Sequence, residues 1–195
     1  MDSATHKSRG LRSAMTRFDD LNKLFDVWRT DWLDQYREHQ FLPLRIAKRL
    51  QEFLGCPEDF SDADPTHPQT VKYVSPTEAK WDDRTEQFSL VPYDNPFADI
   101  RFHKDGFFYF GLRVFLEHGP TTYPKQPFWF LLRAQFNGSQ FNVWVQRSGE
   151  QFELGAPHDY KTDALCDHLY GLLKADLAKS PMIRDTQDAY KIGFT

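Results

Sequence analysis

The sequence has few cysteines and no long apolar run, and both absences limit where the protein is expected to work. Cys56 and Cys166 are the only cysteines among 195 residues, so the chain can form at most one disulfide. No stretch approaches the roughly 20 apolar residues that a membrane helix needs, and no signal peptide is recognisable. We therefore expect a cytoplasmic protein with reduced cysteines and no membrane segment.

The sequence also lacks a strong excess of either charge. Its formal net charge is -4 and its isoelectric point is about 6.0. Because nucleic-acid binding depends on a positive field, we do not expect a nucleic-acid partner, even though aromatic rings on strands could stack on bases. An anion would have to be bound by a local cluster of basic side chains.

Signatures of nucleophilic, nucleotide-dependent and metal-dependent catalysis are missing. No serine lies in a Gly-x-Ser-x-Gly elbow, and there is no phosphate loop or dinucleotide fingerprint. None of the seven histidines has a recognised ligand spacing, and the acidic residues after Pro57 lack the spacing of a calcium loop. We therefore predict neither a metal nor a cofactor.

One short segment has the form of a nuclease signature. Glu78-Ala79-Lys80 matches the acid-x-lysine half of a PD-(D/E)XK pattern, and Asp64 lies upstream. Such a site needs its carboxylates on adjacent strands around a metal ion. Because Ser75-Pro76 predicts a turn or helix start just before Glu78, a nuclease is the weakest of our alternatives.

The composition is that of a folded domain with a polar N-terminal extension. Hydrophobic residues make up 40% of the chain and aromatic residues 16%, which is enough for a core without disulfides. The first seventeen residues hold four basic side chains and one Asp, with little to bury. We predict a flexible basic tail over residues 1–16, whose composition a targeting segment would share, and a single α+β domain over residues 17–195.

Helical spacing of apolar residues opens this domain. One stripe runs from Phe18 to Tyr36 at steps of three and four, and a shorter stripe runs from Leu44 to Leu54. We expect the first helix to end before Pro43, which would begin the second helix. Helices are thus predicted within residues 17–55.

The same spacing returns near the C-terminus. An acidic, proline-containing loop is expected over residues 56–70, and a β-meander over residues 71–155 separates this loop from the last helix. That helix is predicted over residues 160–180, with Thr162 as its N-cap and a stripe of leucines.

The meander is predicted from period-two alternation of apolar residues. Residues 71–74 and 87–91 are expected strands, and a better-defined antiparallel sheet is expected from Ala98 onward. With the strands in this order we predict at least five antiparallel strands. The register between the strands that flank the 118–127 loop is not fixed by the sequence, because that connection is long.

Turn residues predict the register elsewhere. A two-residue type I′ turn at Asn137-Gly138 would pair Ala134 with Phe141, and a second at Ser148-Gly149 would pair Val145 with Phe152. Both registers keep apolar side chains on one face, which strand pairing requires when that face is buried.

A different loop is needed at residues 103–107. A two-residue Asp105-Gly106 turn would set apolar side chains opposite polar ones. A three-residue loop Lys104-Asp105-Gly106, with glycine in the left-handed conformation, instead pairs Phe102 with Phe108 and Ile100 with Phe110.

The alternation predicts one apolar core face. Its members are Ile100, Phe102, Phe108, Phe110, Leu112, Val114, Leu116, Phe128, Phe130, Leu132, Phe141, Val143, Val145 and Phe152. Since amphipathic helices and an apolar sheet face need each other, we predict an α+β fold in which N-terminal and C-terminal helices cover this face.

The other face of the sheet is the predicted functional surface. It combines arginines with aromatic and amide side chains, a mixture suited to anionic or aromatic ligands and to protein partners. The candidate binding residues are Arg101, His103, Tyr109, Arg113, Glu117, Trp129, Arg133, Asn142 and Trp144.

Two functions and a structural alternative follow from this face. In the first, the protein is a binding module that uses the face for a protein partner or for a homodimer. In the second, it is an enzyme or carrier that encloses a small anionic ligand between Arg101, Arg113 and Arg133, with His103 or Glu117 as proton-transfer group. Alternatively, the face is purely structural and its arginine–aromatic pairs stabilise the sheet.

Overall fold

The computed structural model describes residues 16–61, 69–93, 102–117, 125–157 and 159–179. Two helices and eight strands occur within these ranges. The chain divides into two compact units, Met1–Arg37 and Glu38–Thr195, which are described separately. Both units contribute to the first helix, α1 (Arg17–Leu54).

The first unit contains the N-terminal half of α1. A capping box begins the helix: the backbone N–H of Asp19 donates to Thr16 Oγ1 at 3.2 Å, and the backbone N–H of Thr16 donates to Asp19 Oδ2 at 2.8 Å. The apolar stripe predicted from the sequence is exposed, with Phe18 at 70% and Trp28 at 59%.

The second unit begins within the same helix, so the expected helix end before Pro43 is wrong. Pro43 lies inside α1 and is itself buried. Leu42, Ile46 and Leu50 are fully buried at helical spacing on both sides of it. Burial of this stripe offsets the hydrogen bond that proline removes from a helix interior.

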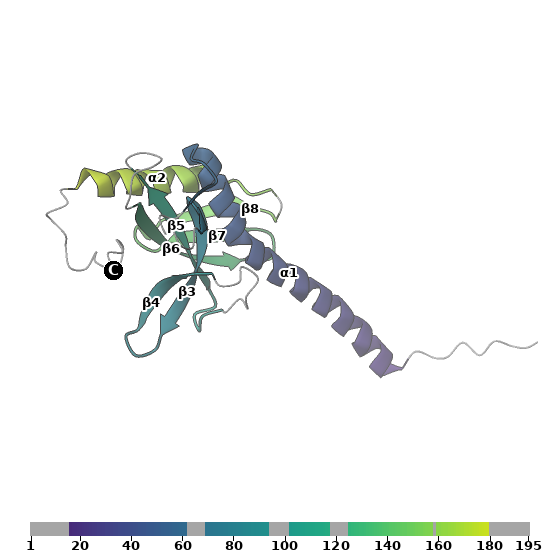
Figure 1. Ribbon diagram of the computed structural model, residues 1–195. Helices are drawn as coiled ribbons and strands as arrows, with labels where there is room; N and C mark the ends of the chain where they lie inside the picture. Colours follow the sequence, from purple (N-terminus) through teal and green to yellow (C-terminus); the bar gives the residue numbers. More distant parts are fainter. Residues whose placement is uncertain (1–15, 62–68, 94–101, 118–124, 158, 180–195) are drawn as a thin grey trace, which may run out of the picture. The chain divides into compact units, whose positions relative to one another are not determined.

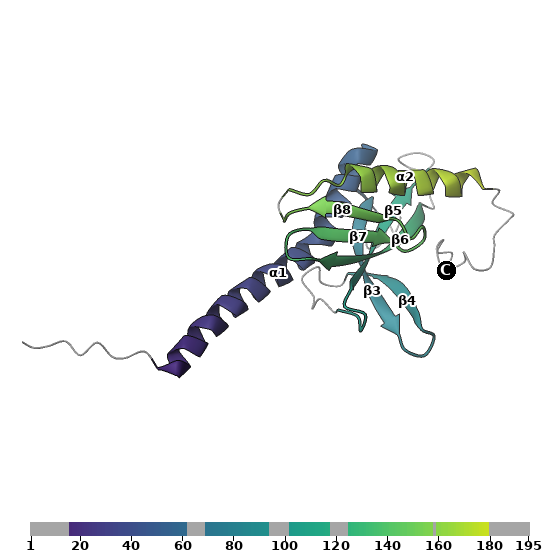
Figure 2. The ribbon, with the colours of Figure 1, turned by 180° about the vertical axis from the view of Figure 1, so that it is seen from behind.

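Six antiparallel strands form the main sheet in the order β4-β3-β5-β6-β7-β8, which confirms the predicted α+β class (Figure 1). Its strands are β3 (Val74–Asp82), β4 (Gln87–Pro92), β5 (Phe108–Leu116), β6 (Gln126–Phe136), β7 (Phe141–Val145) and β8 (Gln151–Gly155). Two short strands, β1 (Asp59–Ser61) and β2 (Thr70–Lys72), form a separate pair. The β3–β4 hairpin projects beyond the other strands in both ribbon views (Figures 1 and 2).

The three-residue loop before β5 is confirmed. Phe102 bridges Phe108, and Gly106 has a φ of 82°, the left-handed conformation that the loop requires. The backbone N–H of His103 closes the loop by donating to the Phe107 carbonyl at 2.9 Å. The second expected pair, Ile100 with Phe110, lies outside the described residues at Ile100.

The predicted registers of the two later hairpins are wrong by two residues. Val143 pairs with Ala134 rather than with Leu132, and with Phe152 rather than with Leu154. At the first hairpin the loop has four residues, because Asn137 Oδ1 accepts hydrogen bonds from the backbone N–H groups of Ser139 and Gln140 at 3.1 and 3.0 Å. A shift of two keeps each side chain on its predicted face.

The core lies between the apolar sheet face and two helical segments. From the helices it contains Leu42, Ile46, Ala47, Leu50, Leu165, Cys166, Leu169 and Leu173; from the strands it contains Val74, Phe108, Phe110, Leu112, Val114, Phe128, Phe130, Leu132, Ala134, Phe141, Val143, Val145 and Leu154. Leu116 and Phe152 are partly buried against it, whereas Phe102 is exposed.

The C-terminal helix, α2 (Asp163–Ala178), agrees with its predicted range and starts after Thr162, whose side chain makes no cap hydrogen bond. Figure 2 shows α2 beside β8 and β7. Arg147, in the turn before β8, forms an ion pair with Asp176 through both guanidinium nitrogens. This pair fixes the end of α2 to the sheet in addition to its leucine stripe.

Candidate functional site

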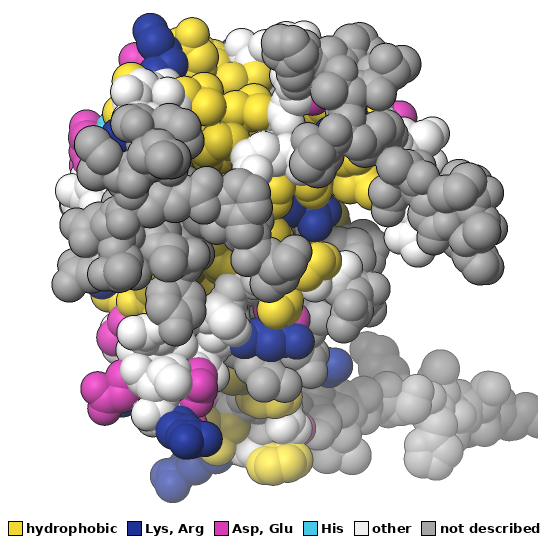
Figure 3. All heavy atoms as spheres, turned by 60° about the vertical axis from the view of Figure 1, so that its left-hand side comes forward, with side chains coloured by type: hydrophobic (Ala, Val, Ile, Leu, Met, Phe, Trp, Pro, Cys, Tyr) yellow, Lys and Arg dark blue, Asp and Glu magenta, His cyan; other side chains and the backbone are white. Residues whose placement is uncertain are grey.

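The second face of the main sheet is the face opposite the core. The observed registers place on it Ser75, Thr77, Ala79, Trp81, Phe88, Leu90, Tyr109, Gly111, Arg113, Phe115, Trp129, Leu131, Arg133, Gln135, Asn142 and Trp144. Arg101 lies outside the described residues. Figure 3 shows Lys and Arg side chains lying among hydrophobic side chains on one side of the molecule.

The second face is concave where β4 approaches β5. The Phe88 and Tyr109 rings stack with centroids 4.1 Å apart, although β3 lies between their strands. A Cβ on Gly111 would come within 2.8 Å of Leu90 Cδ2 for the same reason. Flat strands two places apart are about 9.5 Å apart, so side chains meet here because the sheet curves strongly.

Arg113 is the most unusual charge on this face. Its guanidinium carbon lies 4.8 Å from the Phe115 ring centroid and 5.5 Å from that of Trp129. Its Nε is buried without a hydrogen-bond partner. Burial lowers the pKa of Arg113, and among the described residues no carboxylate opposes that effect. A guanidinium held this way between two rings can bind an anion from outside the chain by donating hydrogen bonds to it.

Arg133 repeats the arrangement one strand away. It lies 4.3 Å from the Phe107 ring centroid and 5.4 Å from that of Trp144, and its Nε is also buried without a partner. Asn142, on the neighbouring strand, has a buried Oδ1 that accepts no hydrogen bond. Burial and a 2.7 Å hydrogen bond to Asp105 raise the pKa of nearby Tyr109.

The two arginines do not converge on one point. Arg113 pairs with Trp129, whereas Arg133 pairs with Tyr109, so they are four residues apart along the sheet. At about 3.3 Å per residue this separation is roughly 13 Å. The expected clamp of arginines around one anion is therefore not formed by these two.

His103 occupies a different part of the face. Its ring lies 4.8 Å from that of Trp81, 5.4 Å from that of Phe88 and 5.6 Å from that of Tyr109. Its Nε2 is buried without a hydrogen-bond partner, and its Nδ1 lies 3.2 Å from Asp105 Oδ1. The histidine is thus enclosed by aromatic rings.

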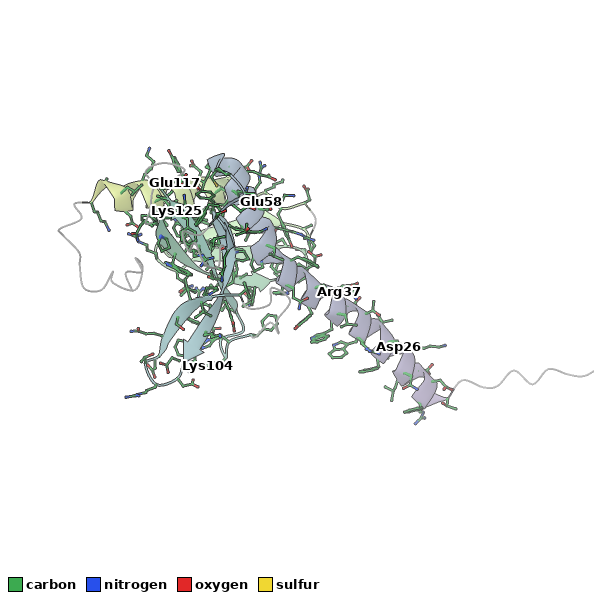
Figure 4. The ribbon with its side chains drawn as sticks, viewed as in Figure 1. Asp26, Arg37, Glu58, Lys104, Glu117 and Lys125 are labelled. Atoms are coloured by element: carbon green, nitrogen blue, oxygen red, sulfur yellow. The ribbon has the colours of Figure 1, made fainter. Side chains whose placement is uncertain are left out.

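The Glu117 carboxylate already has interaction partners within the chain. Its carboxylate forms an ion pair with Lys125, whose side chain is 2% exposed, and accepts a hydrogen bond from the Tyr73 hydroxyl. Lys125 also donates to the Tyr73 hydroxyl at 3.1 Å and lies 4.7 Å from the Phe60 ring centroid. Glu117 and Lys125 are labelled together in Figure 4, far from Lys104. This cluster is stabilising rather than free for proton transfer.

A cavity of about 710 Å³ opens beside residues 74–76 of β3, which do not pair with β4. Its walls come from α1, from the segment around β1 and β2, and from β3, β4 and β5. The described lining residues are Leu44, Ala47, Lys48, Gln51, Glu52, Glu58, Lys72, Val74, Ser75, Pro76, Pro92, Tyr93 and Arg113.

Polar groups in this cavity are placed to donate hydrogen bonds. Ser75 is the direct cross-strand neighbour of Arg113, and its Oγ is buried without a partner. Burial and the charge of Glu78 raise the pKa of Tyr93 to about 12, so its hydroxyl stays protonated at neutral pH. Serine and tyrosine hydroxyls beside a guanidinium are suited to a carboxylate or phosphate oxygen.

The charges that line the cavity are not all paired with charges of the described residues. Glu58 forms an ion pair with Lys72 at 3.4 Å, and Glu52 with Arg49 at 3.2 Å. Among the described residues, Lys48 and Arg113 form no ion pair. Lys48 is exposed, so Arg113 is the enclosed cation of the cavity.

Sequence reasoning identified Arg113 but missed Ser75, Tyr93 and the helical wall. No local signal could have found them, because α1, β3 and the end of β4 meet only in the folded chain.

The expected turn or helix start at Ser75-Pro76 is wrong, since β3 runs through both residues and Glu78. Glu78 pairs with Lys80 at 3.4 Å, and Asp64 lies outside the described residues.

The described part of the chain holds no group of three or more His, Cys, Asp and Glu residues arranged to bind a metal ion. Within the same ranges, no helix is long and apolar enough to cross a membrane. The chain matches no protein-family model, and no curated protein or solved structure is significantly similar to it.

Proposed function

We propose that the protein is a binding protein for a small anionic ligand, held in the cavity at Arg113. The observation that carries the proposal is a partly buried guanidinium that lines a cavity of about 710 Å³ and forms no ion pair with the described residues. This volume falls in the range of roughly 300–1,000 Å³ that is usual for ligand sites. Partial burial of a charge without an ion pair costs free energy, which a bound anion would recover.

Binding is favoured over catalysis by the positions of the candidate proton-transfer groups. Neither His103 nor Glu117 is among the described residues that line the cavity. His103 is enclosed by aromatic rings, and the Glu117 carboxylate is paired with Lys125. A carrier or sensor needs only the anion-binding group and the walls, which are the parts that line this cavity.

The test is to observe the Arg113 Nε–H signal by NMR while phosphate, acetate, benzoate and citrate are added separately. We expect at least one of these anions to shift that signal saturably and to leave the Arg133 signal in place, because Arg133 does not line the cavity. Arg113→Gln identifies the signal. If none of the four anions moves it, the proposal is wrong.

A second candidate function, a partner or homodimer surface, is favoured by the cluster around Arg133. Phe107 and Trp144 enclose this arginine, and the neighbouring Asn142 Oδ1 is unpartnered, a combination found at protein interfaces. Light scattering after size-exclusion chromatography distinguishes the homodimer: the wild type would be a dimer and Trp144→Ala a monomer. A monomeric wild type at all concentrations contradicts self-association.

A further inference from the structure

We infer that the ligand of this cavity is an amphipathic monocarboxylate, with one carboxylate bound by Arg113 and an apolar body along the helical wall. The inference rests on the proposed function and adds the chemical class of the ligand. It follows from the distribution of polar, apolar and acidic groups around the cavity.

The polar end of the cavity is built for one small anion. Ser75 lies opposite Arg113 on the adjacent strand, so their Cβ atoms are within about 5.5 Å of each other. The buried Ser75 Oγ and Arg113 Nε have no hydrogen-bond partner among the described residues, and Tyr93 lines the same cavity. A carboxylate has two oxygens that accept several hydrogen bonds, so it can use the guanidinium fork and a hydroxyl together.

The remaining lining distinguishes a monocarboxylate from a more highly charged anion. The charged side chains that line the cavity are Lys48, Lys72 and Arg113 against Glu52 and Glu58, so the lining has an excess of one positive charge, which a ligand with a single negative group would balance. A phosphate dianion or a nucleotide would need further enclosed cations, whereas Lys48 and Lys72 are exposed. One carboxylate matches the single enclosed guanidinium.

Apolar side chains supply the rest of the wall. Leu44 and Ala47 come from α1, and Val74, Pro76 and Pro92 come from the ends of β3 and β4. Ligand sites are usually lined in this way, with apolar walls and a few polar groups that fix orientation. A ligand without an apolar body would leave these walls in contact with water and gain little from them.

A peptide that extends the sheet is a poorer occupant. The cavity lies beside the β3 edge that β4 leaves unpaired, a position where an added strand could bind. Pro76 lies on this edge and has no backbone N–H to donate to such a strand. Proline on an edge strand prevents strand addition, so a small molecule fits the observations better.

The experiment is a calorimetric titration of the full chain with acetate, butyrate, hexanoate and octanoate, and with hexanol and phosphate. Affinity should rise roughly fourfold for each buried methylene, and hexanol and phosphate should bind far more weakly than hexanoate. Arg113→Gln should weaken octanoate binding by roughly ten- to a hundredfold.

Two further variants distinguish a loss of ligand binding from a loss of folding. Arg133→Gln is the matched control, because it also removes a guanidinium from between two rings but lies outside the cavity lining; it should leave octanoate binding unchanged. Arg113→Lys keeps the charge and loses the fork, so it should bind octanoate with intermediate affinity.

The outcomes separate this inference from the proposed function. Equal affinity for acetate, phosphate and octanoate, lost in Arg113→Gln, would overturn the amphipathic ligand and leave anion binding at Arg113 standing. Octanoate binding that Arg113→Gln and Arg133→Gln leave equally strong would overturn both, because the apolar chain would then bind elsewhere. Hexanol binding as tightly as hexanoate would remove the role of the carboxylate.

Discussion

Lys125 shows how a single residue determines which charges of this protein are available. Its side chain is 2% exposed and is surrounded by the Glu117 carboxylate, the Tyr73 hydroxyl and the Phe60 and Tyr73 rings. An ammonium group this deeply buried is stable only with a paired anion. Glu117 is thereby committed to the fold, while the partly buried Arg113 forms no ion pair with the described residues.

Glu117→Gln should therefore destabilise the fold strongly. The substitution keeps the shape of the side chain but leaves the Lys125 charge buried without its anion, and such a change costs about 3–5 kcal/mol of unfolding free energy. Urea denaturation measures this loss. Glu58→Gln is the matched control: its pair with Lys72 is 61% and 68% exposed, so we expect a change below about 1 kcal/mol. Equal effects of the two substitutions would contradict the role assigned to Lys125.

At the scale of elements, the curvature between β3, β4 and β5 shapes the second face. Gly111 is buried in the middle of β5, where Thr77 and Leu90 cover the position that a Cβ would occupy. Because the glycine has no side chain, β4 can approach β5 across β3 and stack Phe88 on Tyr109. The curvature of the sheet therefore depends on the absence of a Cβ atom at Gly111.

Gly111→Ala should disturb this curvature. The new Cβ would lie 2.1 Å from Thr77 Oγ1 and 2.8 Å from Leu90 Cδ2, so both side chains would have to move, at a cost of about 1–3 kcal/mol. Thermal unfolding measures the loss of stability. Gly171→Ala in α2 is the control, because nothing lies within 4 Å of its Cβ position and alanine favours helix; it should stabilise by up to about 1 kcal/mol. A neutral Gly111→Ala would contradict the close approach.

At the scale of the whole molecule, ion pairs connect the helices to the rest of the fold. Within the second unit, Arg49 of α1 pairs with Asp163 of α2 at 2.9 Å, and the Tyr160 hydroxyl donates to the Glu38 carboxylate of α1 at 3.0 Å. Arg147 and Asp176 connect the turn before β8 to the end of α2. Acid is expected to break these connections once the carboxylates become protonated.

Asp176 gives the pH dependence a defined sign. Burial alone would raise its pKa, but the hydrogen bonds and charge of Arg147 outweigh burial and hold the pKa below its usual value of about 4. A carboxyl with a lowered folded pKa contributes stability above its unfolded pKa, and that contribution is lost as pH falls through the folded value.

The free energy of unfolding of the wild type should consequently decrease as the pH falls below about 4. Asp176→Asn should have a lower free energy of unfolding at pH 7, and this free energy should decrease less as the pH falls. Urea midpoints of both proteins, measured from pH 7 to pH 2.5, test this. Parallel curves for the wild type and the variant would show that Arg147 does not hold the Asp176 charge in the folded state.

The sequence by itself determined which side chains of the later strands share a face of the sheet. Alternation along residues 107–155 was enough to predict the core face, because side chains on a strand point to opposite sides at every step. It also predicted the loop at Gly106, where only a left-handed residue keeps Phe102 opposite Phe108. The hairpin registers failed by two residues because alternation is unchanged by such a shift, and the Asn137 side-chain hydrogen bonds that fix the loop are not periodic.

Only the tertiary structure decided which of the candidate residues share a site. The sequence placed Arg113 and Arg133 on one face, but their separation depends on the pairing of β5 with β6 across a long connection. The sequence also gave no reason to place Ser75, Tyr93 and Leu44 around Arg113, since these three residues belong to parts of the chain that meet only after folding. Patterning is a local property that burial imposes on each element, whereas a cavity arises from contacts between residues far apart in the chain.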